Sequence, residues 1–287
     1  MANRFGPAGN SESFYAQGHT STKEQPAWLH AMGLDAFEYS FGRGVRIREQ
    51  AADEIRQQAQ LYDIQLSVHA PYYINLATEE EAKMDNSIRY LVQSAQAAQW
   101  MGAKRVIFHP GVQGKSERVD AIKRIETLLS RAMRELDAQG FGAITFCPES
   151  MGKINQIGDL VETIAFCELD ERLIPCLDFG HLHARTLGAF HSAEDFRHAL
   201  DLVENRLGME RARALHVHFS RIEFTQAGEK RHWTYDDRQF GPDFEPLARE
   251  LARRQYDATI ICESKRTMAE DAATYKQLYL QALEELK

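Results

Sequence analysis

Six segments of the chain place an imidazole or a carboxylate at the end of a short apolar run. The side chains are His69 in LSVHAPY, His109 in VIFHPG, Glu149 in TFCPES, Asp178 and His181 in CLDFGH, His216 and His218 in LHVHFS, and Glu263 in IICES. Neutral imidazole and ionised carboxylate are groups that a divalent transition metal binds directly. Packed together without a cation, they would repel one another or lose their charge. The pattern therefore predicts a metal centre, and its mixed nitrogen and oxygen donors favour zinc, manganese or iron over calcium or magnesium.

The number of candidate ligands exceeds what one ion needs. A tetrahedral site takes four protein ligands at most. The candidates that the strand ends supply are His69, His109, Glu149, Asp178, His181, His216 and Glu263. We therefore expect at least two ions that share a bridging carboxylate. Such pairs, about 3.5–4 Å apart, typically clamp the attacking and leaving oxygens of a phosphodiester displacement.

Short apolar runs alternate with segments of helical period along the whole chain. The runs predict strands at 4–6, 36–40, 65–69, 105–109, 143–148, 174–178, 212–218 and 259–262. The periodic segments predict helices at 23–32, 48–62, 85–101, 116–138, 157–167, 193–207, 243–253 and 268–286. Eight strand–helix units are typical of an α/β protein with the (β/α)8 TIM barrel fold, and we expect residues 1–287 to form it as a single domain.

The barrel also explains why the candidate ligands follow strands. The C-terminal ends of barrel strands converge on one face, where the loops build the active site. An open doubly wound sheet is the alternative, but the glycine-rich fingerprint of that fold is missing after the first strand. The positions of the ligands therefore favour the barrel.

Composition narrows the classes of protein. The chain is 44% hydrophobic and 26% charged, with a formal net charge of −8 that argues against a broad basic surface wrapping nucleic acid. No apolar run approaches the roughly 18 residues of a membrane span. The segment MANRFGPAGN lacks the apolar core of a secretory signal, and the four cysteines show no CxxC spacing. We expect a cytoplasmic protein with no membrane contact and no obligate protein partner evident.

The chain resembles the endonuclease IV family of the xylose isomerase-like TIM barrels over most of its length. The matching segments are VHAPYYINLA around His69, FHPG around His109, PES at Glu149, DFGHLHARTLG at Asp178 and His181, and ESK at Glu263. The resemblance implies a metal-dependent phosphodiesterase that cleaves damaged DNA 5′ to abasic sites with a metal-activated water. It also implies two or three Zn²⁺ ions, with Mn²⁺ or Fe²⁺ as alternatives, and a catalytic role for Glu149 in positioning the hydroxide.

The resemblance further implies which residues hold the first two ions. The first ion would be held by His69, His109 and Glu149. Glu149 would bridge to the second ion, which Asp178, His216 and Glu263 would complete. His218 stands where the family commonly has asparagine, and it is an additional candidate either for the metal or for the substrate.

A third ion would use His181 and His232, together with an acidic residue in the loop after the seventh strand. In GEKRHWTYDD the acidic position falls on Lys230, which does not ligate while it is protonated. We therefore expect a weak or altered third position unless His218, Glu229 or Asp236 takes the place of the missing acid.

The DNA contacts that the resemblance implies are less complete than the metal ligands. Tyr72, Asn75 and Arg43 are the candidate substrate-binding residues. The family inserts a DNA-reading loop after the second strand, whereas this chain has the short SFGRGVR. Basic residues that we expect near the mouth and that could contact phosphate are Arg43, Arg46, Lys115, Lys153, Arg221 and Lys265.

Two other function classes remain open. A metal-dependent sugar isomerase or epimerase on the same barrel would use one ion and a carboxylate base such as Glu149 or Glu263 to move a proton beside a carbonyl. The acidic balance and the short loop after the second strand favour this class, whereas the number of imidazoles favours the nuclease. A catalytically inactive metal-binding barrel is the third class, and it would need no intact bridging set.

Overall fold

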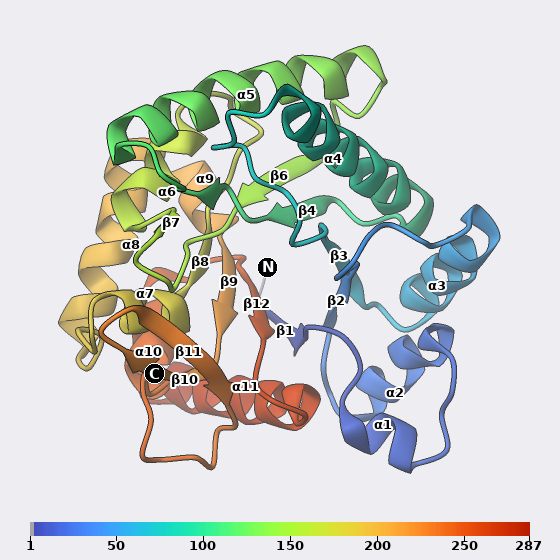
Figure 1. Ribbon diagram of the computed structural model, residues 1–287. Coiled ribbons are helices and arrows are strands. Elements are labelled where there is room, and N and C mark those ends of the chain that lie inside the picture. Colours follow the sequence, from blue (N-terminus) through green and yellow to red (C-terminus); the bar gives the residue numbers. More distant parts are fainter. Residues whose placement is uncertain (1–2) are drawn as a thin grey trace.

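Eight parallel strands close into a barrel in the computed structural model, which describes residues 3–287 (Figure 1). The strands are β1 (Arg4–Pro7), β2 (Ala36–Ser40), β3 (Gln65–His69), β4 (Arg105–Phe108), β6 (Thr145–Pro148), β8 (Cys176–Asp178), β9 (His216–Phe219) and β12 (Thr259–Cys262). They form two sheets in the orders β1-β12-β9-β8 and β2-β3-β4-β6. Parallel bridges between Ala8 and Glu38 and between Glu149 and Cys176 join the sheets. The prediction of a (β/α)8 barrel is confirmed.

Helices form a ring around the strands (Figure 1). They are α2 (Gln25–Ala31), α3 (Glu49–Leu61), α4 (Glu81–Met101), α5 (Arg118–Ala138), α6 (Leu160–Cys167), α8 (Ala193–Leu207), α10 (Glu245–Arg254) and α11 (Met268–Glu284). Gly102 ends α4 in the left-handed conformation, and a capping box between Asp159 and Glu162 starts α6. Within residues 3–287, no helix combines the length and the apolar character needed to span a bilayer.

Several short elements lie in segments that the sequence pattern leaves as loops. They are α1 (Glu12–Ala16), α7 (Phe179–Arg185), α9 (Met209–Arg213), the ribbon of β5 (Gly111–Val112) with β7 (Gln156–Ile157), and the hairpin of β10 (Arg221–Thr225) with β11 (Gly228–Trp233). The hairpin packs against α7 beside the mouth of the barrel (Figure 1). It follows β9 directly, so it extends the seventh strand–helix unit over one side of the mouth.

The seventh strand differs most from its predicted bounds. It covers His216–Phe219 rather than 212–218, because Ala212 belongs to the short helix α9. His216 and His218 therefore lie on one interior face of β9, where residues two apart along a strand are separated by about 6.6 Å. His216 pairs in register with Thr259 and Cys176, whereas His218 pairs with Ile261 and Asp178. The two imidazoles thus occupy different layers of the barrel.

The strands separate an apolar layer from a polar one. Large buried side chains such as Phe5, Phe108 and Phe219 pack in the main hydrophobic cluster, together with apolar residues of the helices. The interior of the barrel instead holds polar side chains that are fully or almost fully buried: Glu38, Ser67, Glu149, Asp178, His216 and His218. Burial of so many polar groups is costly unless each finds a partner. Their partners are therefore the central question of the site.

Closure between β1 and β2 depends on a residue without a side chain. Asp35 N donates to Phe5 O, and Gly9 N donates to Glu38 O, so the two strands lie close on either side of Gly6. A Cβ atom on Gly6 would lie 1.7 Å from the carbonyl oxygen of Ala36. That oxygen belongs to the backbone of β2, so the strand itself would have to move.

We expect Gly6→Ala to destabilise the protein by about 3 kcal/mol or more, at the upper end of what overpacking costs. Gly18→Ala is the control, because Gly18 has a φ of +90° with nothing within 4 Å of an added Cβ. The control should lose only the roughly 1–2 kcal/mol of a left-handed residue. Chemical denaturation of both variants measures the difference. Equal losses would show that the approach of β1 to β2 does not constrain residue 6.

Candidate metal centre

Glu149, directly after β6, lies at the centre of the barrel mouth with no exposed surface. Its Oε2 atom is 3.0 Å from His69 Nε2 and 3.1 Å from His109 Nε2. Its Oε1 atom is 3.2 Å from His181 Nδ1 and 3.5 Å from His218 Nδ1. The two oxygens of one carboxylate therefore face two different sets of imidazoles, as a bridging ligand must.

The first set consists of His69, His109 and Glu149, whose ligand atoms lie within 4.8 Å of one another. His69 Nδ1 lies 2.8 Å from the carbonyl oxygen of Ala70, which leaves Nε2 free to face Glu149. Burial lowers the pKa of His69, but contact with the Glu149 carboxylate more than offsets it and raises the pKa to about 9. With no cation present, a proton on His69 thus balances the charge of Glu149.

The second set consists of Glu149, Asp178, His218 and Glu263, again within 4.8 Å. His218 Nδ1 is 3.4 Å from Glu263 Oε1. Burial, with repulsion from Glu149 and Asp178, raises the pKa of Glu263 to about 7. Four buried atoms of this set have no aligned hydrogen bond. His218 Nε2 lies 2.9 Å from Glu38 Oε1, and the other three atoms are Glu149 Oε1, Asp178 Oδ2 and His218 Nδ1.

Those three atoms fit a metal ion. A buried polar atom without a partner normally costs about 1–3 kcal/mol, so native structures rarely leave several together. A divalent cation would satisfy all three at once, because it binds carboxylate oxygen and unprotonated imidazole nitrogen directly. The donor set thus suits a transition metal, and its chemistry does not select which one.

A third set lies at the edge of the mouth. Ligand atoms of His181, His232 and Glu263 come within 4.8 Å of one another. Glu229 faces the same two imidazoles, with Oε2 3.6 Å from His181 Nε2 and Oε1 3.8 Å from His232 Nε2. His181 Nδ1 lies 3.0 Å from Ser150 O, so Nε2 is its free nitrogen. Of the three residues expected to replace the missing acid, Glu229 is thus the one that faces both His181 and His232.

A β-bulge explains how Glu229 comes to face His232. Alternate residues of a regular strand share a face, so Lys230 would be expected beside His232. In the ladder with β10, however, Lys230 has no partner, because its two neighbours pair with consecutive residues of β10. The extra residue reverses the alternation and brings Glu229 to the face of His232. Lys230 instead forms an ion pair with Glu223.

His216 lies below the second set rather than in it. Its Nε2 atom is 3.0 Å from Glu38 Oε2, and its Nδ1 atom is 3.4 Å from Arg105 Nη1. His218, one layer higher, faces Glu149 and Glu263 in its place. A fourth group of possible ligand atoms, Cys176, His216 and His218, is buried at this deeper level. The sequence pattern missed Glu38, because it stands in the middle of β2 and not at a strand end.

A cavity of about 410 Å³ covers the three sets, with Tyr72 and Lys153 on its wall. Tyr72 and Tyr73 are 48% and 50% exposed, with ring centroids 4.5 Å apart. The Tyr73 hydroxyl, and then the Arg43 guanidinium, lower the pKa of the Tyr72 hydroxyl, which places Arg43 beside it. These residues can meet a substrate at the rim.

Asn75 has a different role in the structure. Its Oδ1 atom accepts hydrogen bonds from the backbone N–H groups of Ala77 and Val112, both at 3.1 Å. The side chain therefore ties the loop after β3 to the segment after β4. Its carbonyl oxygen is used within the protein, so Asn75 shapes the mouth and does not offer that oxygen to a substrate.

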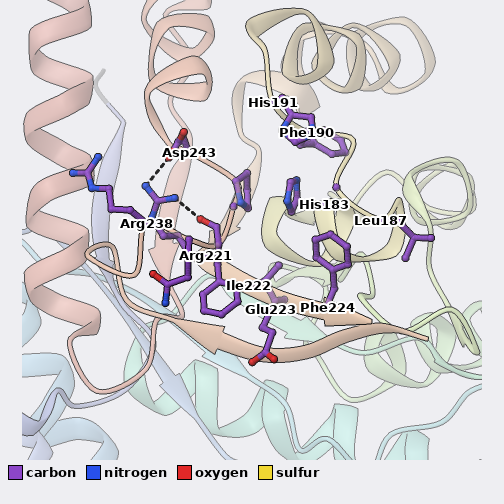
Figure 2. Close-up of a pocket in the computed structure, with 15 residues that line it drawn as sticks. His183, Leu187, Phe190, His191, Arg221, Ile222, Glu223, Phe224, Arg238 and Asp243 are labelled. Atoms are coloured by element: carbon purple, nitrogen blue, oxygen red, sulfur yellow. Dashed lines mark hydrogen bonds and ion pairs between the residues drawn. The ribbon is translucent and has the colours of Figure 1, made fainter. Parts of the chain in front are cut away.

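A second cavity, of about 510 Å³, lies between the end of α7, strand β10 and residues 238–243 (Figure 2). Figure 2 shows Arg221 in its wall, joined to Asp243. The guanidinium is 2% exposed and also donates to the carbonyl oxygens of Tyr235 and Phe240. Arg221, a candidate phosphate contact in the sequence, therefore holds the loop after the hairpin and is not available to phosphate.

Known sequences are similar to most of this chain. A family model described as a xylose isomerase-like TIM barrel matches residues 26–286. An uncharacterized protein of Methanocaldococcus jannaschii is 34% identical over 236 residues, which cover 82% of this chain and 84% of that protein. A protein of Mycoplasma pneumoniae named probable endonuclease 4 is 27% identical over 209 residues, covering 70% of this chain and 68% of that protein.

Solved structures share the fold at low identity. Endonuclease IV from Thermus thermophilus superposes with a TM-score of 0.69 at 18% identity, covering 99% of this chain and 100% of that one. A D-psicose 3-epimerase gives 0.68 at 14% identity, with 99% of both chains covered. Barrels named for different reactions are thus equally close in shape. The sequence match, which spans nearly the whole chain, shows that this protein belongs to the xylose isomerase-like TIM barrel family.

Proposed function

We propose that the protein is a metal-dependent phosphodiesterase of the endonuclease IV type, which cleaves DNA on the 5′ side of abasic sites. The observation that carries this proposal is the buried Glu149 carboxylate, whose two oxygens face separate imidazole sets. Such a bridge suits ions that act together on one phosphodiester. The similarity to the Mycoplasma pneumoniae protein named probable endonuclease 4 supports the same activity.

The three sets would divide the ions among them. Glu149 would bridge the first two, and the residues that would complete the sets are His69 and His109, then Asp178, His218 and Glu263, then His181, His232 and Glu229. Zn²⁺, Mn²⁺ or Fe²⁺ held there would supply Lewis acidity toward phosphate oxygens and a water of lowered pKa.

The side chains around the cavity would bind and orient the DNA. Lys153 and Arg43 at the rim offer positive charge to backbone phosphates, and the exposed rings of Tyr72 and Tyr73 offer faces on which bases stack. Glu149, fully buried with imidazoles beside both oxygens, would keep its position through the reaction. Preorganised groups of this kind lower the barrier because they need not rearrange as charge develops.

A sugar epimerase is the second candidate. The cavity volume of about 410 Å³ lies within the range of small-ligand sites, and both Glu149 and Glu263 line the cavity. Epimerisation needs a carboxylate positioned to remove a proton beside a carbonyl, which either residue could do. The fold similarity to a D-psicose 3-epimerase is compatible with this alternative. Three sets of candidate ligands exceed the single ion that this reaction requires, so the phosphodiesterase is preferred.

The first test counts ions. We expect the wild-type protein to retain at least two transition-metal ions per chain, measured by elemental analysis after chelation and reloading. Glu149→Gln should lose at least one ion and its activity, because a neutral amide cannot bridge two cations. Glu250→Gln is the matched control, since Glu250 is a similarly buried carboxylate that pairs with Arg197 and Arg253 on the outer ring. Reloading of one ion or fewer by the wild type would contradict the bridged centre.

The second test concerns the β-bulge. Deletion of Lys230 removes the extra residue and leaves Glu229 and His232 on one face, so the deletion variant should bind as many ions as the wild type. The deletion also removes the ion pair between Lys230 and Glu223, which lies at the surface and should contribute little to stability. Glu229→Gln should weaken one ion by more than the roughly 10- to 100-fold that loss of an outer-shell partner costs. Metal titrations followed by native mass spectrometry count the bound ions in both variants. If the Lys230 deletion loses an ion and Glu229→Gln keeps all of them, Glu229 is not a ligand.

The third test separates the two reactions. We expect metal-dependent, chelator-sensitive incision of duplex DNA containing an abasic site, with weak binding and a shallow salt dependence because the chain carries a net charge of −8. Arg43→Ala should reduce the slope of log affinity against log salt by about 0.9, the contribution of one phosphate contact. Arg134→Ala, an exposed arginine on α5, should leave it unchanged. Epimerisation of a ketose without incision under any metal would overturn the proposal in favour of the alternative.

A further inference from the structure

Glu38 is a buried carboxylate inside the barrel, one layer below the mouth. It stands in the middle of β2 with 0% of its surface exposed. Ser67 Oγ donates to its Oε2 atom at 2.8 Å, and His216 Nε2 lies 3.0 Å from the same oxygen. Its other oxygen, Oε1, is 2.9 Å from His218 Nε2. Glu38 therefore contacts the imidazole that reaches up to the second set.

The contact between Glu38 and His218 joins two buried atoms. Glu38 Oε1 and His218 Nε2 lie 2.9 Å apart, and neither atom has an aligned hydrogen bond within residues 3–287, so each is the polar atom available to the other. An ionised carboxylate accepts only, so the partner nitrogen must carry the proton. With its proton on Nε2, a neutral His218 has its lone pair on Nδ1. That nitrogen faces Glu149 and Glu263, at 3.5 Å and 3.4 Å.

His216 and Arg105 hold Glu38 from below. Arg105 Nη1 lies 3.4 Å from His216 Nδ1 and also donates to Thr259 Oγ1 at 3.1 Å and to Leu215 O at 3.3 Å. His216 can therefore accept from Arg105 and donate to Glu38. One guanidinium and one carboxylate balance each other, and both imidazoles can stay neutral. Both nitrogens of His216 are thus occupied, which explains why it is not a candidate for the second set.

We infer that Glu38 is a positioning residue that fixes the proton and the orientation of His218, so that a metal ion binds this imidazole through Nδ1. Carboxylates that hold a ligating histidine in this way typically contribute 10- to 100-fold to metal affinity. The inference rests on the metal centre of the proposed function and is independent of which substrate is cleaved.

The first experiment needs no variant. Nitrogen NMR of isotope-labelled histidines in the Zn²⁺-loaded protein reports which ring nitrogen carries the proton. We expect the proton of His218 and of His216 on Nε2, with the ion on Nδ1 of His218. His69 and His181 are internal controls with the opposite arrangement, because their Nδ1 atoms face backbone carbonyl oxygens. A proton on Nδ1 of His218 would overturn the inference.

The second experiment measures affinity. Co²⁺ titration followed by visible absorption should show one ion bound 10- to 100-fold more weakly in Glu38→Gln, as expected for a lost outer-shell partner. Glu250→Gln, the buried carboxylate on the outer ring, should bind within about twofold of the wild type, since it lies outside the site. Unchanged binding in Glu38→Gln would contradict the role. If Glu38→Gln fails to fold, the NMR measurement on the wild type still tests the inference.

Three further outcomes separate this inference from the proposed function. A sulfur-to-cobalt charge-transfer band would place an ion on Cys176, His216 and His218 in the deeper layer and would overturn the inference. Absence of incision with the expected protonation of His218 would reject the proposed reaction and leave the role of Glu38 intact. Failure of the wild type to bind any transition metal would reject both.

Discussion

The burial of the Glu149 carboxylate is the constraint on which the barrel mouth depends. An ionised group without solvent contact costs several kcal/mol unless cations or strong hydrogen bonds surround it. Here the surrounding imidazoles come from β3, the residue after β4, α7 and β9. These elements are far apart in the chain, and only a closed parallel barrel brings their ends to one point. The charge of Glu149 is therefore compensated only in the complete fold.

The buried charges inside the barrel lie in two layers that are compensated in different ways. In the lower layer, Arg105 and Glu38 form a charge-balanced pair through His216. In the upper layer, the protein balances Glu149, Asp178 and Glu263 with protons alone. Neighbouring carboxylates raise the pKa of His69, His181 and His218 despite their burial, and burial raises the pKa of Glu263. The charges of the lower layer balance by themselves, whereas the upper layer keeps buried atoms without hydrogen-bond partners that a cation would satisfy. His218 connects the two.

Much of the fold can be predicted from the sequence, because apolar residues repeat at different intervals in strands and in helices. The predicted strands at 36–40, 65–69 and 259–262 have the observed bounds, since each is an apolar run ended by turn residues. The seventh strand is misplaced because the apolar residues of α9 continue into it without a break. From the predicted bounds it is therefore not evident which histidine of LHVHFS faces the mouth.

The parts of the site that the sequence does not reveal depend on three-dimensional neighbours. Glu38 lies in the middle of a strand, where an acidic residue gives no signal until its partners on β9 are known. Asn75 matches a family segment but bonds to its own backbone surroundings. The bulge at Lys230 leaves the hydrophobic pattern of the hairpin unchanged, so no periodicity marks it.

The bulge in β11 also bears on how such centres change over evolution. Insertion of one codon into a strand ordinarily exchanges its two faces and would turn a ligand away from its ion. Here the bulge absorbs the extra residue, so an acid two positions before the histidine and an acid three positions before it reach the same point. A lineage can therefore pass between the two spacings in one step without losing the pair. Alignments that allow no gap inside a strand will place a lysine opposite the acid and count a working site as broken.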